Sequence, residues 1–465
     1  MLEGLSIKEI LISEPLESEI MRLEAEFYTA KTFDFQNAFK GESVLDFVQY
    51  GTSEELNEDN EGYPILRLNE FNSAFIGIPS KFCKKISNET FESLKLKKND
   101  VLICRTNGNP KLVGKSALVP ADYNYAYASY LFRIRPKREI INSSTLVCFL
   151  NSKFGRMEIE KFSMASNQVN FSPAKFREMR IPKFTNNLNQ IIESNYFKAY
   201  QLLEDSKATY NQAESLLLKT LGLENFQPSQ EPVNVKRFSE SFGNSGRLDA
   251  EYYQIKYEEI QSHIFTFKNG YTTVSSEFEI SKDVIDRSKK AYNYTEISDV
   301  NVSDGSVEYN LIDTEDLPAN GKLVLKERQI IISKVRPYRG AVGIIRNAPE
   351  NYVGSGAFTV LSEVSSYKLE ALQVLLRSKP YQELIMKFNV GSSYPVVKDE
   401  DILQLPIPVI DFDKQQEIAD LVKESFKLKK QSEHLLEVAK TAVEMAIEQD
   451  EEMAIAFIKE TTFTA

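Results

Sequence analysis

A run of seven residues occurs twice in this chain with only conservative exchanges. It reads Arg-Leu-Glu-Ala-Glu-Phe-Tyr at residues 22–28 and Arg-Leu-Asp-Ala-Glu-Tyr-Tyr at residues 247–253, an offset of 225 residues. Two more pairs of segments match in the same order: 98–105 with 327–334, and 180–182 with 404–406. Similar offsets in a constant order indicate a tandem duplication with small changes in loop length. The repeated unit is about half of the 465-residue chain.

Each unit divides into a mixed part and a helical part. The mixed part is rich in β-branched and aromatic residues interrupted by Gly, Pro, Asn and Asp, which is typical of a strand-rich globular domain with a few helices. The second part contains neither Pro nor Gly and predicts one long helix. We therefore expect an α+β fold with two tandem domains, each followed by a long helix. The expected bounds are 1–187 for the first domain, 188–221 for its helix, 222–246 for a linker, 247–411 for the second domain, 412–449 for its helix and 450–465 for a C-terminal tail.

Both long helices carry a seam of apolar and small residues at alternating steps of three and four, which is the spacing of a coiled coil. The first seam comprises Ile192, Tyr196, Ala199, Leu203, Ser206, Tyr210, Ala213 and Leu217. The second comprises Ile418, Leu421, Ser425, Leu428, Ser432, Leu435, Ala439, Ala442 and Ala446. We expect the two helices to pair antiparallel within the chain, and homodimerisation through the seam is the alternative. A helix of this length spans roughly 50 Å at about 1.5 Å per residue, so it would hold the two domains apart.

Charge restricts the classes of partner. The formal net charge is −11, which argues against a chain that coats nucleic acid without selectivity. Basic and acidic runs are nevertheless separated along the chain, so the sequence is compatible with local basic faces. For any single run, solvated loop surface is the alternative. The basic runs are 81–85, 94–98 and 133–138, and the acidic runs are 54–61 and 448–452.

The N-terminus carries acidic residues where a secretory signal would have a basic flank and an apolar run, and no later stretch is long enough to cross a bilayer. These features predict a cytoplasmic protein. Cys83, Cys104 and Cys148 are an odd number of cysteines, which favours buried free thiols in a reducing compartment. His263 and His434 have no cysteine or histidine at metal-ligand spacing, so neither a zinc site nor a histidine-based hydrolytic centre is supported.

Residues 108–116, Gly-Asn-Pro-Lys-Leu-Val-Gly-Lys-Ser, look like a phosphate-binding loop but have five residues where that loop has four. A hairpin explains them better: residues 101–106 and 112–119 are strand-like, and 107–110 have turn chemistry. The second unit offers an equivalent strand at 330–335 and a basic turn at 336–340. Duplicated basic turns suggest a duplicated site for a polyanion, although an exposed basic turn taken alone is ordinary.

Reading DNA requires such side chains, because Arg and Lys bind guanine or phosphate and Asn and Gln bind adenine. In the first unit the candidate DNA-binding residues are Arg105, Asn107, Asn109, Lys111, Lys115, Asn167, Gln168 and Asn170. In the second unit they are Lys334, Arg336, Tyr338, Arg339, Ser392, Ser393 and Tyr394. For the polar segments just before 180–182 and 404–406, a capping or turn role is the alternative. The sequence contains no amino-methyltransferase signature, nuclease carboxylate cluster or helicase motif, so we expect no catalytic residues and no metal site.

The succession of domain, long helix, domain and long helix resembles the specificity subunits of type I restriction-modification systems. The resemblance covers nearly the whole chain. It rests mainly on Leu-Pro-Ile-Pro-Val-Ile at 405–410, which runs into Asp-Lys-Gln-Gln-Glu-Ile-Ala-Asp-Leu at 413–421, and on the motif at 247–253. Residues 180–184, Arg-Ile-Pro-Lys-Phe, are a weaker copy that lacks the Gln-Gln-Glu-Ile-Ala run.

The resemblance implies that each globular domain is a target-recognition domain, reading one half of an asymmetric, gapped site in double-stranded DNA. It further implies that the helices bind two methyltransferase subunits, which modify adenine with S-adenosylmethionine, and indirectly the motor-nuclease subunits, which use ATP and Mg. This chain itself would bind no cofactor and no membrane. Recognition domains vary strongly between members, so the base-contacting residues above rest on this sequence alone.

Two alternatives remain open. The partner could fuse nuclease and methyltransferase in one chain, which this sequence does not distinguish. The chain could also be a coiled-coil adaptor whose globular ends bind proteins. The acidic charge favours the adaptor, and the duplicated basic turns oppose it. Two DNA-reading domains about 50 Å apart would place half-site centres on the order of 10 to 15 base pairs apart.

Overall fold

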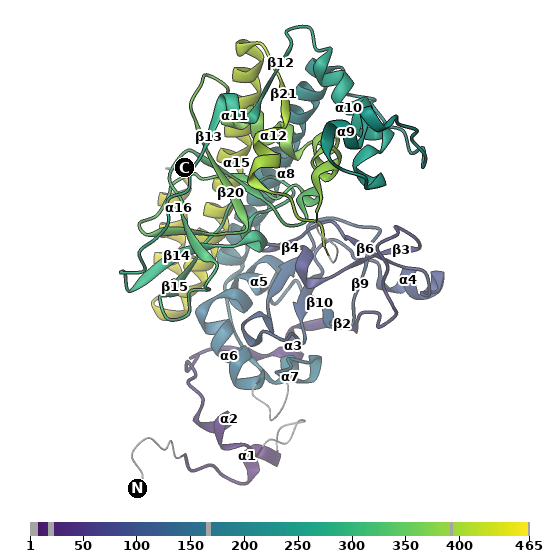
Figure 1. Ribbon diagram of the computed structural model, residues 1–465. Coiled ribbons are helices and arrows are strands. Elements are labelled where there is room, and N and C mark those ends of the chain that lie inside the picture. Colours follow the sequence, from purple (N-terminus) through teal and green to yellow (C-terminus); the bar gives the residue numbers. More distant parts are fainter. Residues whose placement is uncertain (1–7, 17–22, 164–168, 391–393, 464–465) are drawn as a thin grey trace. The chain divides into compact units, whose positions relative to one another are not determined.

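The computed structural model describes residues 8–16, 23–163, 169–390 and 394–463. The chain forms two compact units: unit 1 comprises residues 1–203 and 429–465, and unit 2 comprises residues 204–428. Both boundaries fall inside the long helices, α8 (Asn186–Leu221) and α15 (Phe412–Glu448). Helix and sheet are mixed in both units, as the sequence predicts (Figure 1).

The largest sheet of unit 1 has six strands. Their order is β2 (Leu45–Tyr50), β10 (Leu131–Pro136), β7 (Val101–Cys104), β8 (Ser116–Leu118), β5 (Phe75–Ile76) and β4 (Phe71–Asn72). Strand β7 is buried on both faces because its side chains alternate between two apolar cores. Val101 and Ile103 join one core, and Leu102 and Cys104 join the other. This burial holds the end of β7, where the candidate site begins, in a rigid frame.

Smaller sheets and helices complete unit 1. The other strands are β1 (Ala38–Lys40) paired with β11 (Arg180–Pro182), and β6 (Lys81–Cys83), β3 (Tyr63–Leu66) and β9 (Ala126–Tyr127) in that order. The remaining α-helices are α1 (Ser13–Leu16), α2 (Ala25–Thr29), α3 (Gly41–Val44), α4 (Asn88–Leu94), α5 (Ser143–Asn151), α6 (Lys153–Ser163), α7 (Pro173–Glu178) and α16 (Glu451–Phe463), and the 3-10 helices are η1 (Leu68–Glu70) and η2 (Pro110–Leu112). The segment expected to be a C-terminal tail is therefore helical, and its Ala454 and Ile458 are buried in the core of unit 1.

Unit 2 is built from two four-stranded sheets and one strand pair. The orders are β13 (Phe278–Ile280), β20 (Phe358–Glu363), β17 (Gln329–Ser333), β18 (Val342–Ile344); then β15 (Asn310–Asp313), β14 (Ala291–Thr295), β19 (Tyr352–Ser355), β16 (Gly321–Val324); and β12 (Tyr271–Thr273) with β21 (Pro406–Pro408). Its other helices are α9 (Phe242–Ser245), α10 (Ile255–Phe265), α11 (Val274–Glu277), α12 (Leu369–Arg377), α13 (Lys379–Leu384), α14 (Asp399–Leu403), η3 (Phe238–Glu240), η4 (Ala250–Tyr253), η5 (Ile297–Asp299), η6 (Pro337–Arg339) and η7 (Ile385–Phe388).

The two units share their strand pairings. In unit 1 the antiparallel series is β2-β10-β7-β8, and in unit 2 it is β13-β20-β17-β18. Each unit also has a parallel pair in a separate sheet, β3 with β9 and β14 with β19, and unit 1 has a second parallel pair, β5 with β8. They differ at the sheet edge, because β8 continues into β5 and β4 whereas the sheet of unit 2 ends at β18.

The long helices bury their seams. All eight predicted seam residues of α8 are buried. On α15, Leu421, Leu428 and Ala446 are only half-buried, and Val422 and Lys429, next to the two leucines, are buried instead. The buried stripe of α15 is thus wider than a strict seam.

Polar contacts join the two long helices inside each unit. In unit 2 the Ser206 hydroxyl donates to the Ser425 carbonyl at 2.7 Å, and the Ser425 hydroxyl donates to the Ser206 carbonyl at 2.8 Å. In unit 1 the Ser432 hydroxyl donates to the Ala199 carbonyl at 2.7 Å. These small side chains let the backbones approach closely.

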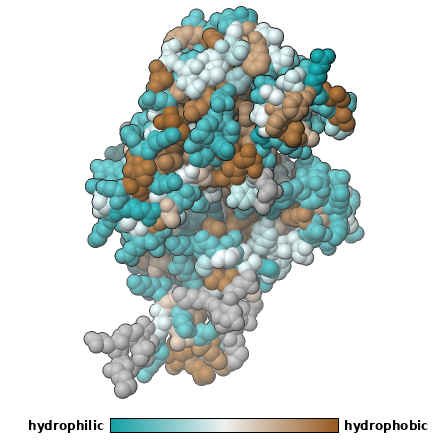
Figure 2. Space-filling view, viewed as in Figure 1, coloured by the Kyte–Doolittle hydropathy of each residue, from teal (hydrophilic) through white to brown (hydrophobic). Residues whose placement is uncertain are grey.

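No helix among the described residues has the length and apolar character needed to cross a membrane. On the face shown in Figure 2, hydrophobic residues form separate patches among hydrophilic ones. The three cysteines are buried and free, as expected. Burial raises the pKa of Cys104 to about 11 and that of Cys148 to about 12, so both thiols stay protonated and are poor nucleophiles near neutral pH.

Candidate nucleic-acid interface

Two equivalent turns carry most of the candidate residues. We define turn 1 as residues 105–115, between β7 and β8, and turn 2 as residues 334–341, between β17 and β18. The first residue of each turn makes equivalent backbone hydrogen bonds. Arg105 N–H donates to the Tyr130 carbonyl at 2.8 Å, and Lys334 N–H donates to the Ala357 carbonyl at 2.9 Å. The carbonyl oxygens of Arg105 and Lys334 accept from Phe171 and Val397, at 2.8 and 3.0 Å.

Turn 1 is longer than the sequence predicts. The second strand, expected from residue 112, begins only at Ser116 because residues 110–112 form the 3-10 helix η2. Pro110 has no N–H to donate to a strand ladder, and the Asn109 side chain caps the helix by accepting from Lys111 N–H at 3.0 Å. The Asn107 side-chain oxygen Oδ1 accepts from Asn109 N–H at 2.8 Å. Both predicted asparagines therefore hold the turn together.

The basic residues of turn 1 differ in accessibility. Lys111 is exposed, whereas Lys115 and Arg105 are half-buried. The Arg105 guanidinium lies 5.3 Å from the centre of the Tyr50 ring, and its buried Nε has no hydrogen-bond partner. Arg105 is thus held against an aromatic side chain at the edge of the sheet, a cation–π arrangement.

Turn 2 presents exposed side chains. Arg336, Tyr338 and Arg339 are all exposed. Arg336 directly precedes the short helix η6, and Tyr338 and Arg339 lie in it. No hydrogen bond or ion pair joins either arginine side chain to the part of the chain that the structure describes. Lys334 is different, because its Nζ lies 3.1 Å from Asp399 Oδ1 and its charge is balanced there.

Each turn lies beside the polar segment that precedes a short helix. An isolated β-bridge joins Thr106 to Asn170 in unit 1, and Val335 to Val396 in unit 2. The Asn170 carbonyl accepts from Lys175 Nζ at 2.7 Å. In unit 2 the exposed Tyr394 directly precedes Pro395, whose carbonyl accepts from Arg336 N–H at 2.8 Å. The predicted residues Asn167, Gln168, Ser392 and Ser393 lie outside the described residues, as does Arg22 of the first repeated motif.

Sequence reasoning missed three side chains at turn 1. Arg156 on α6 donates to the carbonyls of Val113 and Lys111, at 2.7 and 3.2 Å, and burial lowers its pKa. Lys175 on α7 and Tyr50 on β2 are the other two. No sequence signal identifies these residues, because they reach the turn only through the fold.

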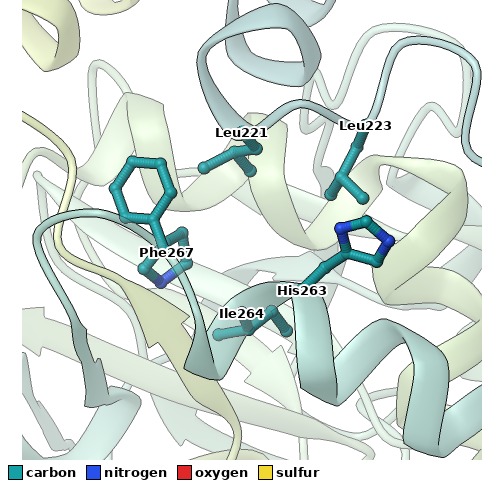
Figure 3. A pocket seen from close by; sticks show the side chains of 6 residues that line it. Leu221, Leu223, His263, Ile264 and Phe267 are labelled. Atoms are coloured by element: carbon teal, nitrogen blue, oxygen red, sulfur yellow. The ribbon is translucent and has the colours of Figure 1, made fainter.

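Two pockets differ in size and lining. One in unit 1 has a volume of about 360 Å³ and includes Lys115, Cys148, Glu433, Glu437 and Lys440 among its lining residues. The pocket in Figure 3 is lined by Leu221, Leu223, His263, Ile264, Phe267 and Pro408 and has a volume of about 10 Å³. That volume holds one water molecule at most. Among the described residues, no group of three or more His, Cys, Asp or Glu side chains is placed to hold a metal ion.

Comparison with known proteins identifies a matching family. Residues 260–438 match the type I restriction modification DNA specificity domain. The chain is 30% identical over 112 residues to the HindI specificity subunit of Haemophilus influenzae, covering 23% of this chain and 24% of that protein. It is 29% identical over 128 residues to the StySPI specificity subunit of Salmonella potsdam, covering 27% of each. These matches span about a quarter of each relative, and they confirm the resemblance inferred from the sequence.

Solved structures of similar proteins cover more of the chain at lower similarity. The HsdS subunit of Thermoanaerobacter tengcongensis is 13% identical, with coverage of 90% of this chain and 98% of that one and a TM-score of 0.30. The type I S subunit of M. genitalium is 12% identical, with coverage of 88% and 94% and a TM-score of 0.36. Scores this low do not show a common arrangement of the whole chain.

Proposed function

We propose that this chain, which resembles type I restriction-modification specificity subunits, is the DNA-reading subunit of such a complex. Each unit reads one half of a bipartite, asymmetric site in double-stranded DNA and does so in the cytoplasm. The observation that carries the proposal is the match of residues 260–438 to a DNA specificity domain, because turn 2 and its unpaired arginines lie inside that segment. The backbone frame shared by turns 1 and 2 extends the proposal to unit 1.

We propose that α8 and α15 form an antiparallel coiled coil within the chain. The residue numbers of the hydrogen-bonded pairs support this: Ala199 pairs with Ser432 and Ser206 with Ser425, so the number rises by seven on one helix as it falls by seven on the other. Homodimerisation through the α8 seam is less favoured, because its side chains are already buried inside this chain. The coiled coil would act as a spacer between the two recognition units.

The proposed partners perform the chemistry. Two methyltransferase subunits would bind the helices and modify adenine with S-adenosylmethionine, and motor-nuclease subunits would use ATP and Mg. A single partner chain that carries both the nuclease and the methyltransferase is the alternative within this proposal. The chain itself would serve recognition without catalysis. A coiled-coil adaptor that binds only proteins is not favoured, because it accounts neither for the DNA specificity match nor for two equivalent basic turns.

Selection from a random pool of duplex DNA tests the proposal. The full chain, bound to the methyltransferase subunit with which it co-purifies, should enrich two short motifs at a fixed separation. Their centres should lie on the order of 10 to 15 base pairs apart. Affinity for the selected site should fall linearly with salt on a double-logarithmic plot. A single continuous motif, or the absence of any enriched sequence, would contradict the proposal.

A further inference from the structure

Three arginines adopt a left-handed backbone conformation that favours glycine. Among the described non-glycine residues with positive φ are Arg287 (+57°), Arg328 (+61°) and Arg336 (+50°). This conformation costs an L-residue with a Cβ conformational energy, so a bulky side chain there requires a compensating role.

Two of the three arginines have such a role inside the fold. Arg287 donates to the carbonyls of Leu317, Pro318 and Gly321, at 3.3, 2.7 and 3.1 Å. Arg328 bonds to two carboxylates, Glu363 at 2.8 Å and Glu370 at 3.1 Å. These bonds stabilise unit 2 and offset the cost of the backbone conformation at both residues.

Arg336 has no such compensation. Its side chain is exposed and bonds to no described residue, although its N–H is fixed by the Pro395 carbonyl at 2.8 Å. Arg339, three residues on, donates its N–H to the Arg336 carbonyl at 3.0 Å and is also exposed. Arg336 directly precedes the 3-10 helix η6 and Arg339 ends it, so one tight turn carries two exposed guanidinium groups. Among the described residues, no side-chain contact offsets the cost of this backbone conformation at Arg336.

The asparagines of turn 1 are not free in this way. Reading adenine with an asparagine uses the amide oxygen and the amide nitrogen together. The side-chain oxygens of Asn107 and Asn109 already accept backbone N–H groups of turn 1, which turns both amides toward the turn's own backbone. The exposed cation of this turn, Lys111, is a single point charge suited to a phosphate oxygen.

Given the proposed function, on which this inference rests, we propose that turn 2 reads guanine through Arg336 and Arg339 in the major groove. A guanidinium matches guanine O6 and N7 with two parallel hydrogen bonds, which is the most common base-specific contact in protein–DNA recognition. Turn 1 contacts the DNA backbone and contributes no base reading through its asparagines. The half-site of unit 2 accordingly contains at least one G·C pair that Arg336 specifies.

The test repeats the random-pool selection with the full chain in its methyltransferase complex, comparing wild type with Arg336→Gly and Arg339→Ala. Glycine suits the left-handed conformation, so Arg336→Gly should keep or raise the melting temperature. One wild-type half-site should contain a guanine whose preference Arg336→Gly reduces by roughly 5- to 150-fold. Arg339→Ala should weaken the base preference in the same half-site, and the motif of the other half-site should not change. Replacing that guanine by 7-deazaguanine, which lacks the N7 acceptor, should weaken wild type and leave Arg336→Gly unaffected.

Arg287→Gly is the matched control, because Arg287 has the same backbone conformation but bonds within the fold. It should lower the melting temperature and leave both motifs unchanged. If wild type yields two motifs and Arg336→Gly yields the same two, or if neither wild-type motif contains guanine, the inference is wrong while the proposed function stands. If wild type enriches no sequence, the proposed function itself fails.

Discussion

Single residues show how far a run of charges can mislead. The basic run at 133–138 suggests a local basic face, but Arg133 is only 3% exposed and lies 3.2 Å from the fully buried Asp100. Arg135 donates to the same carboxylate at 3.0 Å, and the Lys97 N–H donates to it at 2.8 Å. Two of the four basic side chains in this run, Arg133 and Arg135, are therefore paired with one buried carboxylate. A burial pattern has to be known before a run of charges is assigned to a surface.

Glu158 on α6 gives a pH prediction at this scale. It is 1% exposed, and burial raises its pKa above the ordinary value of 4.5, although the Arg180 N–H donates to Oε2 at 3.1 Å. The folded state thus binds this proton more tightly than the unfolded chain does. The contribution of this group to stability is present below 4.5 and is lost as the pH rises to the folded pKa.

Glu158→Gln cannot ionise and keeps an oxygen to accept the Arg180 N–H. The variant should be more stable than wild type at pH 7, and the difference should shrink to near zero as the pH falls below 4.5. Urea denaturation at a series of pH values measures this. If the difference in the free energy of unfolding stayed constant with pH, ionisation of the Glu158 carboxylate would not be its cause.

Among the secondary-structure elements, periodicity predicts the long helices well, because their bounds depend on the local sequence. The long helices begin and end within two residues of the expected positions, because uninterrupted helical spacing and flanking prolines define them. The hairpin at turn 1 and the helix α16 were not predicted correctly. Pro110 and Asn109 form a 3-10 turn inside apparent strand sequence, and α16 depends on burial of Ala454 and Ile458 in a distant core.

The candidate site was predictable only as a location. Duplicated motifs identified both turns, since equivalent sequence positions share a backbone frame. The sequence does not distinguish Lys334, whose charge Asp399 balances, from the exposed Arg336 and Arg339. That distinction depends on which side chains the fold brings near each of them.

The serine contacts between the long helices predict a strong steric effect. Ser206→Leu removes a hydroxyl that donates at 2.7 Å and forces a larger side chain between close backbones. We expect a loss of at least about 2 kcal/mol in the free energy of unfolding, measured by urea denaturation. Ala208→Leu, on the exposed face of the same helix, is the matched control and should change stability little. Equal effects of the two substitutions would show that the helices tolerate separation.

For the whole molecule, the proposed spacer makes a quantitative prediction. One heptad inserted after residue 203 in α8 and one after residue 428 in α15 would lengthen both helices by about 10 Å. The preferred separation of the two half-sites should grow by about three base pairs, while each motif stays the same. Selection from random duplex DNA measures both quantities. Changed motifs at an unchanged separation would refute the division between reading units and spacer.

The composition of unit 1 also has a consequence for biosynthesis. Its core contains Leu435, Ala439, Ala442 and Ile458, which a ribosome adds only after the whole of unit 2. Unit 2 is one continuous stretch, residues 204–428, and is complete before those residues emerge. The N-terminal segment of unit 1, up to residue 203, therefore has to wait, with part of its apolar interior uncovered, until α15 and α16 leave the exit tunnel.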